Sequence, residues 1–297
     1  MDRQTQAYAF ALTAVLFWST VATAFKLSLR HLDPAQLLFY ANIVSIITLF
    51  LVLLVQKKLH LLAQYSKYDL ARAAALGFLN PFLYYTVLFK AYDLLPAQEA
   101  QPLNYTWAIM LALLSIPLLK QRLGLKEFGA IVVSYFGVVV IATHGDFLAL
   151  RFSNIAGVLL ALGSTVIWAL YWIYNTKDGK DPVPSLFLNF VFGFPFVLAW
   201  TLIFSDVQVT SAKGLLGAAY VGVFEMGITF VFWLNALRLS SSTAKVGTLI
   251  FFSPFLSLIF IHFLVGEEIL LSTIVGLAFI VLGTVLQQLS HKKAVTE

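Results

Sequence analysis

A single glutamate interrupts an apolar run in the last third of the chain. Residues 221–233 read VGVFEMGITFVFW, with Glu225 at the fifth position. In such apolar surroundings a carboxylate can bind a cationic group, exchange a proton or hydrogen-bond to a neighbouring helix. The position of Glu225 therefore raises the question of what surrounds it.

An earlier segment has the same character. LGFLNPFLYYTVL at 76–88 places Asn80 where the later run places Glu225. At helical spacing each segment presents a stripe of small, polar, hydroxyl and small side chains. The stripes consist of Gly77, Asn80, Tyr84 and Ala91, and of Gly222, Glu225, Thr229 and Ala236. They predict that Asn80, Tyr84, Glu225 and Thr229 face a substrate, and the alternative is polar packing between helices.

A third segment, PAQEAQPLNYTW at 96–107, is too polar for lipid contact. Pro102 removes a backbone donor and favours a kink. We therefore expect Glu99, Gln101, Asn104 and Tyr105 to face an internal surface, and Asn104 and Tyr105 to line the cavity. The alternative is a helix end at the membrane surface, which suits Pro96 to Glu99 better than Asn104.

The tryptophans divide by their depth in the expected membrane spans. Trp172 and Trp200 lie near span ends, where aromatic anchors are typical. Trp18 and Trp107 lie near span centres, where they either stack on a substrate or fill the helix bundle.

Motifs for other chemistries are absent from the sequence. There is no GxxxxGK[ST] phosphate loop, no HExxH and no cysteine, and the five histidines, at 31, 60, 144, 262 and 291, are scattered. The sequence therefore predicts no ATP hydrolysis, no metal site, no cofactor and no catalytic nucleophile–base set.

The composition indicates an integral membrane protein. The 297 residues are 60% hydrophobic and 11% charged, whereas a soluble domain has about 25% charged residues. A bilayer takes about 20 apolar residues as a helix, and breaks at charged or turn-forming clusters leave ten such stretches. They cover 7–29, 34–55, 70–94, 96–119, 126–144, 154–175, 183–204, 213–238, 243–265 and 270–288.

The lysines and arginines predict the orientation. With a cytoplasmic N-terminus, 14 of the 19 fall on the inner side and 5 on the outer side. The inner set is Arg3, Lys57, Lys58, Lys67, Arg72, Lys120, Arg122, Lys126, Lys177, Lys180, Arg238, Lys245, Lys292 and Lys293. Both termini are predicted to be cytoplasmic, and the net charge of +5 does not require a nucleic acid partner.

The spans repeat. A shift of 145 places Gly77 on Gly222 and Asn80 on Glu225, and a shift of 150 places Trp18 on Trp168. These offsets predict two five-helix repeats, residues 1–150 and 151–297. Because five is odd, the second repeat must enter the membrane from the opposite side. The repeat also requires the first apolar segment as a permanent span, which argues against reading it as a cleavable signal peptide.

Three stretches resemble the drug/metabolite transporter superfamily, and in particular its bacterial ten-span branch with two tandem EamA-type halves. They are FWSTVATAFKLSL at 17–29, LNYTWAIMLALLSIPLLKQRL at 103–123 and SPFLSLIFIHFLVGEEILLSTIVGLAFIVLGTVL at 253–286. The second half keeps Pro254 and Glu267 of the family pattern, whereas the first half has Ala108 and Gln121 instead. The resemblance implies a carrier of small metabolites, commonly an exporter, with a central cavity between its halves.

The resulting hypothesis is an all-helical secondary transporter of the bacterial inner membrane. Its substrate would be an amino acid or a related amphipathic compound, bound by Glu225, Asn80, Tyr84, Thr229, Trp18, Asn104, Tyr105 and Trp107. Protons as the coupling ion and a homodimer are further partner hypotheses. The alternatives are an importer or exchanger of a cationic or drug-like solute, a membrane enzyme acting on lipid-linked substrates, and a receptor or scaffold without transport.

Overall fold

The computed structural model describes residues 3–119, 124–146, 153–175, 180–209, 211–240 and 248–296. Within these ranges every regular element is helical. Some residues used in the topology and family arguments lie outside them, namely Lys120, Gln121, Arg122, Arg151, Lys177 and Lys245.

The helices of the first half follow the expected spans. They are α1 (Arg3–Leu29), α2 (Pro34–Val55), η1 (Leu59–Gln64), α3 (Lys67–Gly77), η2 (Phe78–Leu83), α4 (Tyr84–Leu94), α5 (Ala97–Tyr105), α6 (Trp107–Leu119) and α7 (Leu125–Ala142). The fourth expected span is thus divided at Thr106 into α5 and α6.

The second half has a matching series. Its helices are α8 (Ile155–Asn175), α9 (Pro182–Phe204), α10 (Ala212–Tyr220), η4 (Val221–Glu225), α11 (Ile228–Leu239), η5 (Thr248–Phe252), α13 (Ser253–Phe260), η6 (Ile261–Val265) and α14 (Leu271–Thr296). Among the described residues, five helices are long and apolar enough to cross a membrane: Arg3–Leu29, Pro34–Val55, Ile155–Asn175, Pro182–Phe204 and Ala212–Leu237. The number of ten spans stays a prediction.

The same local signals start corresponding helices in the two halves. Asp33 caps α2 and Asp181 caps α9, and each is followed by a proline at the first helical position. Ser66 caps α3 and Ser211 caps α10 through their side-chain oxygens. Such caps satisfy the free backbone N–H groups of a helix start.

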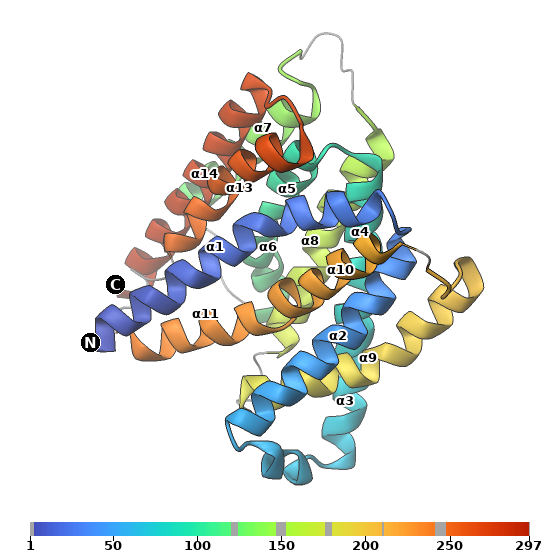
Figure 1. The fold of residues 1–297 in the computed structure, drawn as a ribbon. Coiled ribbons are helices and arrows are strands. Elements are labelled where there is room, and N and C mark those ends of the chain that lie inside the picture. Colours follow the sequence, from blue (N-terminus) through green and yellow to red (C-terminus); the bar gives the residue numbers. More distant parts are fainter. Residues whose placement is uncertain are drawn as a thin grey trace.

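Helix packing repeats as well (Figure 1). α1 packs against α11, and its counterpart α8 packs against α4. Likewise α1 contacts α13 while α8 contacts α6, and α2 contacts α10 while α9 contacts α3. The pairs α2–α9 and α7–α14 join equivalent helices directly. Each of these contacts between one helix of the first half and one of the second thus recurs between the equivalent helices with the halves interchanged. Two repeats related by a pseudo-two-fold axis require this pattern.

The third helix of each half is broken near its middle. η2 separates α3 from α4, and Asn80 within it has the non-helical angles φ −147° and ψ 117°. η4 separates α10 from α11, and Gly227 after it has φ −124° and ψ −97°. Both breaks contain π-helical turns, which often mark functional sites.

Glycines bring helix backbones into contact near the two helix breaks and in the α7–α14 pair. A Cβ on Gly77 would lie 2.3 Å from the Asn189 carbonyl oxygen of α9, and one on Gly222 would lie 2.5 Å from that of Ala41 on α2. In the α7–α14 pair, a Cβ on Gly137 would lie 2.4 Å from the Gly276 oxygen. Small residues at such crossings let membrane helices pack closely.

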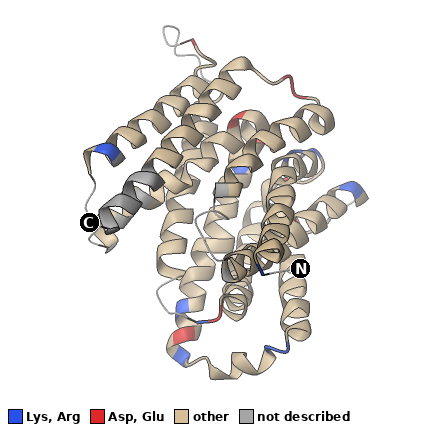
Figure 2. Ribbon diagram, turned by 90° about the vertical axis from the view of Figure 1, so that its left-hand side faces the viewer, with Lys and Arg blue, Asp and Glu red and all other residues tan. Residues whose placement is uncertain are grey.

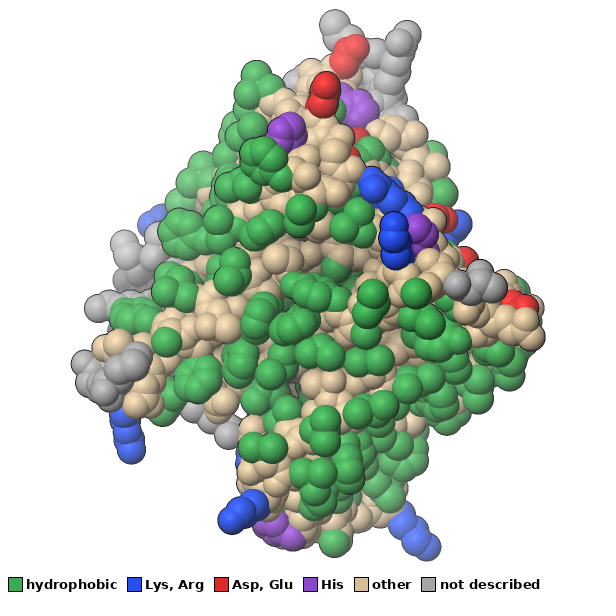
Figure 3. Space-filling view, viewed as in Figure 1, with side chains coloured by type: hydrophobic (Ala, Val, Ile, Leu, Met, Phe, Trp, Pro, Cys, Tyr) green, Lys and Arg blue, Asp and Glu red, His purple; other side chains and the backbone are tan. Residues whose placement is uncertain are grey.

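In the described part, most charged residues lie near helix ends and in the connections between helices (Figure 2). The face shown in Figure 3 carries hydrophobic side chains across its middle, with lysines and arginines at its lower end and in a group at its upper right. This distribution fits a protein whose middle contacts lipid.

Candidate functional site: the central cavity

A cavity of about 260 Å³ lies between the two halves. Residues from α1, α4, α5 and α6 line one part of its wall, and residues from α8, η4, α11 and η5 line the rest. Its volume is close to the lower end of the range typical of small-molecule sites. The cavity therefore suits a small solute.

Aromatic side chains dominate the wall. The aromatic lining consists of Trp18, Phe25, Tyr84, Tyr92, Tyr105, Trp107, Trp168, Trp172, Phe230 and Trp233. Ring contacts join the halves, because Trp18 lies 5.5 Å from Trp233 and Tyr84 lies 4.5 Å from Trp168, measured between ring centroids. Phe230 connects these pairs through Trp18 at 5.8 Å and Trp168 at 5.9 Å. The result is one continuous aromatic surface.

Glu225 is the one charged residue among the described lining residues. It is the last residue of η4, and only 8% of its surface is exposed. The Tyr85 hydroxyl donates a hydrogen bond to Glu225 Oε1 at 3.1 Å. The helix break thus places a nearly buried carboxylate on the cavity wall.

Side-chain hydroxyls stabilise the break around Glu225. The Ser45 hydroxyl of α2 donates to the Met226 carbonyl oxygen at 2.7 Å, and the Thr229 hydroxyl donates to the Phe224 carbonyl oxygen. Membrane helices tolerate such breaks when neighbouring groups satisfy the freed backbone atoms. Thr229 therefore supports the geometry of Glu225 and does not border the cavity itself.

A chain of polar side chains ties α4, α5 and α8 together beside the cavity. The Tyr84 hydroxyl donates to Asn104 Oδ1 at 3.4 Å, and Asn104 Nδ2 donates to the Ser164 hydroxyl at 2.9 Å. Gln101 borders the same space, is 4% exposed, and its Oε1 atom has no hydrogen-bond partner. Gln101, expected on an internal surface but not among the eight expected site residues, is therefore a further candidate residue of the site.

The structure brings six of the eight expected site residues to the cavity: Trp18, Tyr84, Asn104, Tyr105, Trp107 and Glu225. Asn80 and Thr229 are not among its lining residues. Asn80 is fully buried in the break of the first half, and neither polar atom of its side chain has a hydrogen-bond partner.

The four residues of each expected stripe, from Gly77 to Ala91 and from Gly222 to Ala236, do not lie on one surface of their helix. Gly77 and Gly222 face neighbouring helices, and Ala236 packs against Ala7 and Ala11 of α1. The reason is the break in each helix, because a π-helical turn contains more residues than an α-helical turn and rotates the side chains beyond it. The matched stripes were therefore a wrong description of which residues share a surface.

Trp172 was expected to be a membrane anchor, and this expectation was wrong. It lines the cavity because it lies one helical turn after Trp168 and shares its face. Trp168 itself is the repeat partner of Trp18, and this relation could have identified it. Trp200 lies away from the cavity against Phe82 and Phe204.

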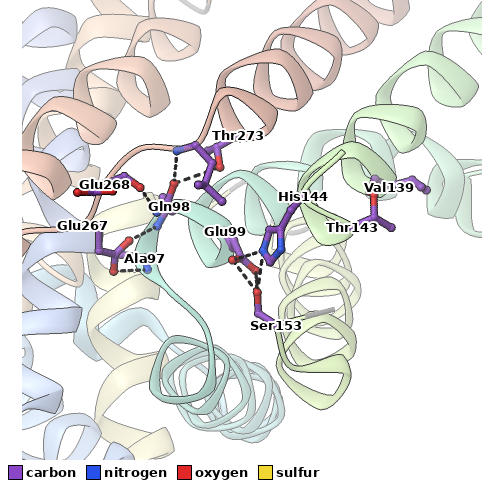
Figure 4. A network of polar contacts seen from close by, with 11 residues as sticks. Ala97, Gln98, Glu99, Val139, Thr143, His144, Ser153, Glu267, Glu268 and Thr273 are labelled. Atoms are coloured by element: carbon purple, nitrogen blue, oxygen red, sulfur yellow. Dashed lines mark hydrogen bonds and ion pairs between the residues drawn. The ribbon is translucent and has the colours of Figure 1, made fainter. Parts of the chain in front are cut away.

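The start of α5 has a separate polar network (Figure 4). The two carboxylate oxygens of Glu267 accept hydrogen bonds from the backbone N–H groups of Ala97 and Gln98, at 2.8 and 3.0 Å. The Gln98 side chain in turn contacts the start of α14 through Leu270 and Thr273. A carboxylate at a helix N-terminus is electrostatically favourable, so this network joins α5 to α14.

Three side chains beside this network resemble a catalytic set at first sight. Glu99 lies 2.9 Å from His144 Nε2, and the Ser153 hydroxyl lies 2.8 Å from Glu99 Oε1 and 2.9 Å from the same Nε2 atom. A serine relay needs the acid and the serine on opposite ring nitrogens. The arrangement is therefore a hydrogen-bonded cluster and lacks the geometry of a serine relay. Among the described residues no group of three His, Cys, Asp or Glu side chains could hold a metal ion.

Comparisons with known proteins agree with this architecture. The EamA-like transporter family matches the chain twice, at residues 5–143 and 155–287. An uncharacterized transporter of Clostridium kluyveri is 25% identical, covering 97% of this chain and 94% of the relative. The uncharacterized transporter YvbV of Bacillus subtilis is 26% identical over 90% of this chain and 86% of its own length.

A solved crystal structure has the same fold. It matches with a TM-score of 0.68 at 20% sequence identity, over 98% of this chain and 99% of the other. Two matches to one family, in tandem across nearly the whole length, agree with the repeated helices. The chain belongs to the EamA-like transporter family.

Proposed function

We propose that this protein is a secondary transporter that carries a small amphipathic metabolite through the central cavity by alternating access, with net transport outward. The observation that carries the proposal is the position of the cavity, which lies between the two halves and is lined by Glu225 of the second helix break and by Tyr84, the residue directly after the first break. Substrate sites of transporters with repeated halves tend to lie at this place, next to discontinuous helices.

The proposed location is the bacterial inner membrane, with both termini in the cytoplasm. The excess of lysine and arginine in the expected inner loops supports this orientation. The proposed substrates are amino acids or related amphipathic compounds. Trp and Tyr rings would bind their apolar bodies, and Glu225 would bind an amino group or exchange a proton.

Transport can be tested in proteoliposomes. The purified protein is reconstituted with and without an inward-directed pH gradient, and uptake and efflux of labelled amino acids and amines are followed. Protein-dependent flux of at least one solute is expected, and Glu225→Gln should remove its dependence on the pH gradient. Full gradient dependence in this variant would exclude Glu225 as the proton-coupling residue.

The direction of transport needs an experiment in cells. Untargeted metabolite profiles of the medium are compared for cells with and without the protein, and an exported compound should accumulate outside when the protein is present. Ligand binding without flux for every solute tested would favour a receptor, and chemical conversion of a lipid-linked substrate would favour an enzyme.

A further inference from the structure

We propose that the solute of the central cavity is a small monoamine, whose protonated amino group carries N–H donors and whose body is a flat aromatic ring. This inference rests on the proposed function, because it specifies the solute of the same site. It is narrower, because amino acids and quaternary ammonium compounds are expected to bind more weakly than the corresponding amine.

The charge of the site favours a cation. Glu225 is 8% exposed and faces the cavity, while lysine, arginine and histidine are absent from the described lining residues. A nearly buried carboxylate without a positive partner is unfavourable. A solute that carries one positive charge would relieve this, whereas a solute that also carries a carboxylate would add a second negative charge close by.

An unpaired acceptor at the wall suits a solute that carries hydrogen-bond donors. The hydroxyl donors of Tyr84 and Tyr85 and the amide donor of Asn104 already bond to protein acceptors. The acceptor Gln101 Oε1 is buried at the cavity wall without a partner. Such an unpaired acceptor is costly, and a ligand N–H group can satisfy it. A protonated primary amine has three N–H donors, enough for Glu225 and Gln101 together.

The aromatic wall favours a flat apolar body. Trp18, Trp233 and Phe230 form one part of the continuous surface around Glu225. Aromatic rings pack at such centroid distances, and a cation within about 6 Å of a ring face is attracted by it. The same surface thus suits both the ring of the solute and the carbon adjoining its ammonium group.

The protein contains a direct reporter of binding. Five of its six tryptophans, namely Trp18, Trp107, Trp168, Trp172 and Trp233, border the cavity. The sixth is Trp200, so a Trp200→Phe background leaves only cavity tryptophans. Their fluorescence in purified, detergent-solubilised protein can be titrated with 2-phenylethylamine, its N-trimethyl derivative, phenylalanine and 3-phenylpropionate.

We expect saturable quenching by 2-phenylethylamine, binding at least tenfold weaker for phenylalanine and the trimethyl derivative, and no binding of 3-phenylpropionate. Glu225→Gln should weaken amine binding at least tenfold, and Glu225→Asp should restore part of it. Gln101→Leu should weaken binding of the primary amine about threefold to tenfold and leave binding of the trimethyl derivative unchanged. Asp93→Asn, a matched acid-to-amide change at a side chain that pairs with Lys90, should leave binding unchanged.

Several results would overturn the inference: phenylalanine binding as tightly as the amine, 3-phenylpropionate binding measurably, or Glu225→Gln retaining full amine affinity in protein that elutes as a single species. The proteoliposome assay separates this failure from that of the proposed function. Flux of another solute without amine binding would contradict only the inference. Amine binding without flux of any solute would contradict the transport function.

Discussion

The two helix breaks occupy matching places in the two halves but hold their polar residues differently. In the second half, Glu225 ends η4, borders the cavity and accepts a hydrogen bond from Tyr85. In the first half, Asn80 lies within η2, away from the cavity, and its amide has no hydrogen-bond partner. Repeated architecture therefore does not imply repeated chemistry.

The surroundings of the two breaks explain the difference. Each break packs against the second helix of the opposite half, η2 against α9 and η4 against α2. In the first half the extended backbone of Asn80 falls inside η2, whereas in the second half the irregular angles fall at Gly227, after η4 and two residues beyond Glu225. Because Glu225 precedes the irregular residue, its side chain points as the helical part of the segment directs it. In this structure that direction is toward the cavity.

The largest expected effect separates the roles of the two breaks. Glu225→Gln should reduce transport by about 10- to 100-fold, because hydrogen bonds to charged groups contribute about 1.5–3 kcal/mol. Asn80→Asp should leave a carboxylate in the first break without access to solute and should not increase transport. Initial rates in proteoliposomes check both, and an Asn80 variant with the larger loss would reverse the comparison.

Packing at the two breaks should instead be equivalent. Gly77→Ala and Gly222→Ala should each destabilise the protein by about 1–3 kcal/mol, because the added methyl group meets a backbone oxygen of the facing helix. Thermal unfolding in detergent measures the effect. Gly129→Ala is the matched control, since a Cβ there meets nothing within 4 Å. A clear difference between the two breaks would show that one half packs more loosely.

A smaller effect is expected from removing the unpaired amide of the first break. Asn80→Leu keeps a similar volume and removes a buried polar group without a partner, so stability should stay within about 1 kcal/mol of the parent or rise. Transport should be retained. A loss of transport at unchanged stability would assign Asn80 a part in the transport cycle.

The smallest expected effect concerns how each broken helix begins. Asp69 in the first turn of α3 forms an ion pair with Lys180, whereas α10 has no acidic residue in its first turn. The Lys180 ammonium and the Ser66 hydroxyl lower the pKa of Asp69 to about 2. Their contribution to stability is present above the unfolded pKa near 4 and is lost as the pH falls toward 2.

Hydrogen exchange measured between pH 5 and pH 2.5 can check this asymmetry. The start of α3 should become less protected than the start of α10 as the pH falls, and Asp69→Asn should show the lower protection of α3 already at pH 5. Equal behaviour of both helices at every pH would contradict a stabilising role of the ion pair.

The sequence predicted the helices and their repetition well because these depend on local signals. Apolar length, the Asp-Pro starts of α2 and α9 and the recurring glycines are visible in the chain itself. Most of the aromatic lining could also have been predicted from the sequence, since Trp168 repeats Trp18 and Trp172 follows one helical turn later. Glu225, the residue most unusual for its surroundings, lies at the cavity.

Other parts of the site depend on geometry that spacing alone cannot supply. The positions of Asn80 and Thr229 relative to the cavity follow from the rotation that each helix break introduces. Gln101 was expected on an internal surface but not among the site residues, because the polarity of its segment suggested a helix end as readily as a binding surface. The cluster of Glu99, His144 and Ser153 joins residues that are up to 54 positions apart.

The glycine contact between α7 and α14 has a consequence for movement. A Cβ on either Gly137 or Gly276 would lie 2.4–2.6 Å from the backbone oxygen of the other. At this crossing the two main chains touch with no side chain between the glycines, which restricts sliding of one helix along the other. In the proposed transport cycle we therefore expect α7 and α14 to move together, with the change in access coming from bending at the helix breaks.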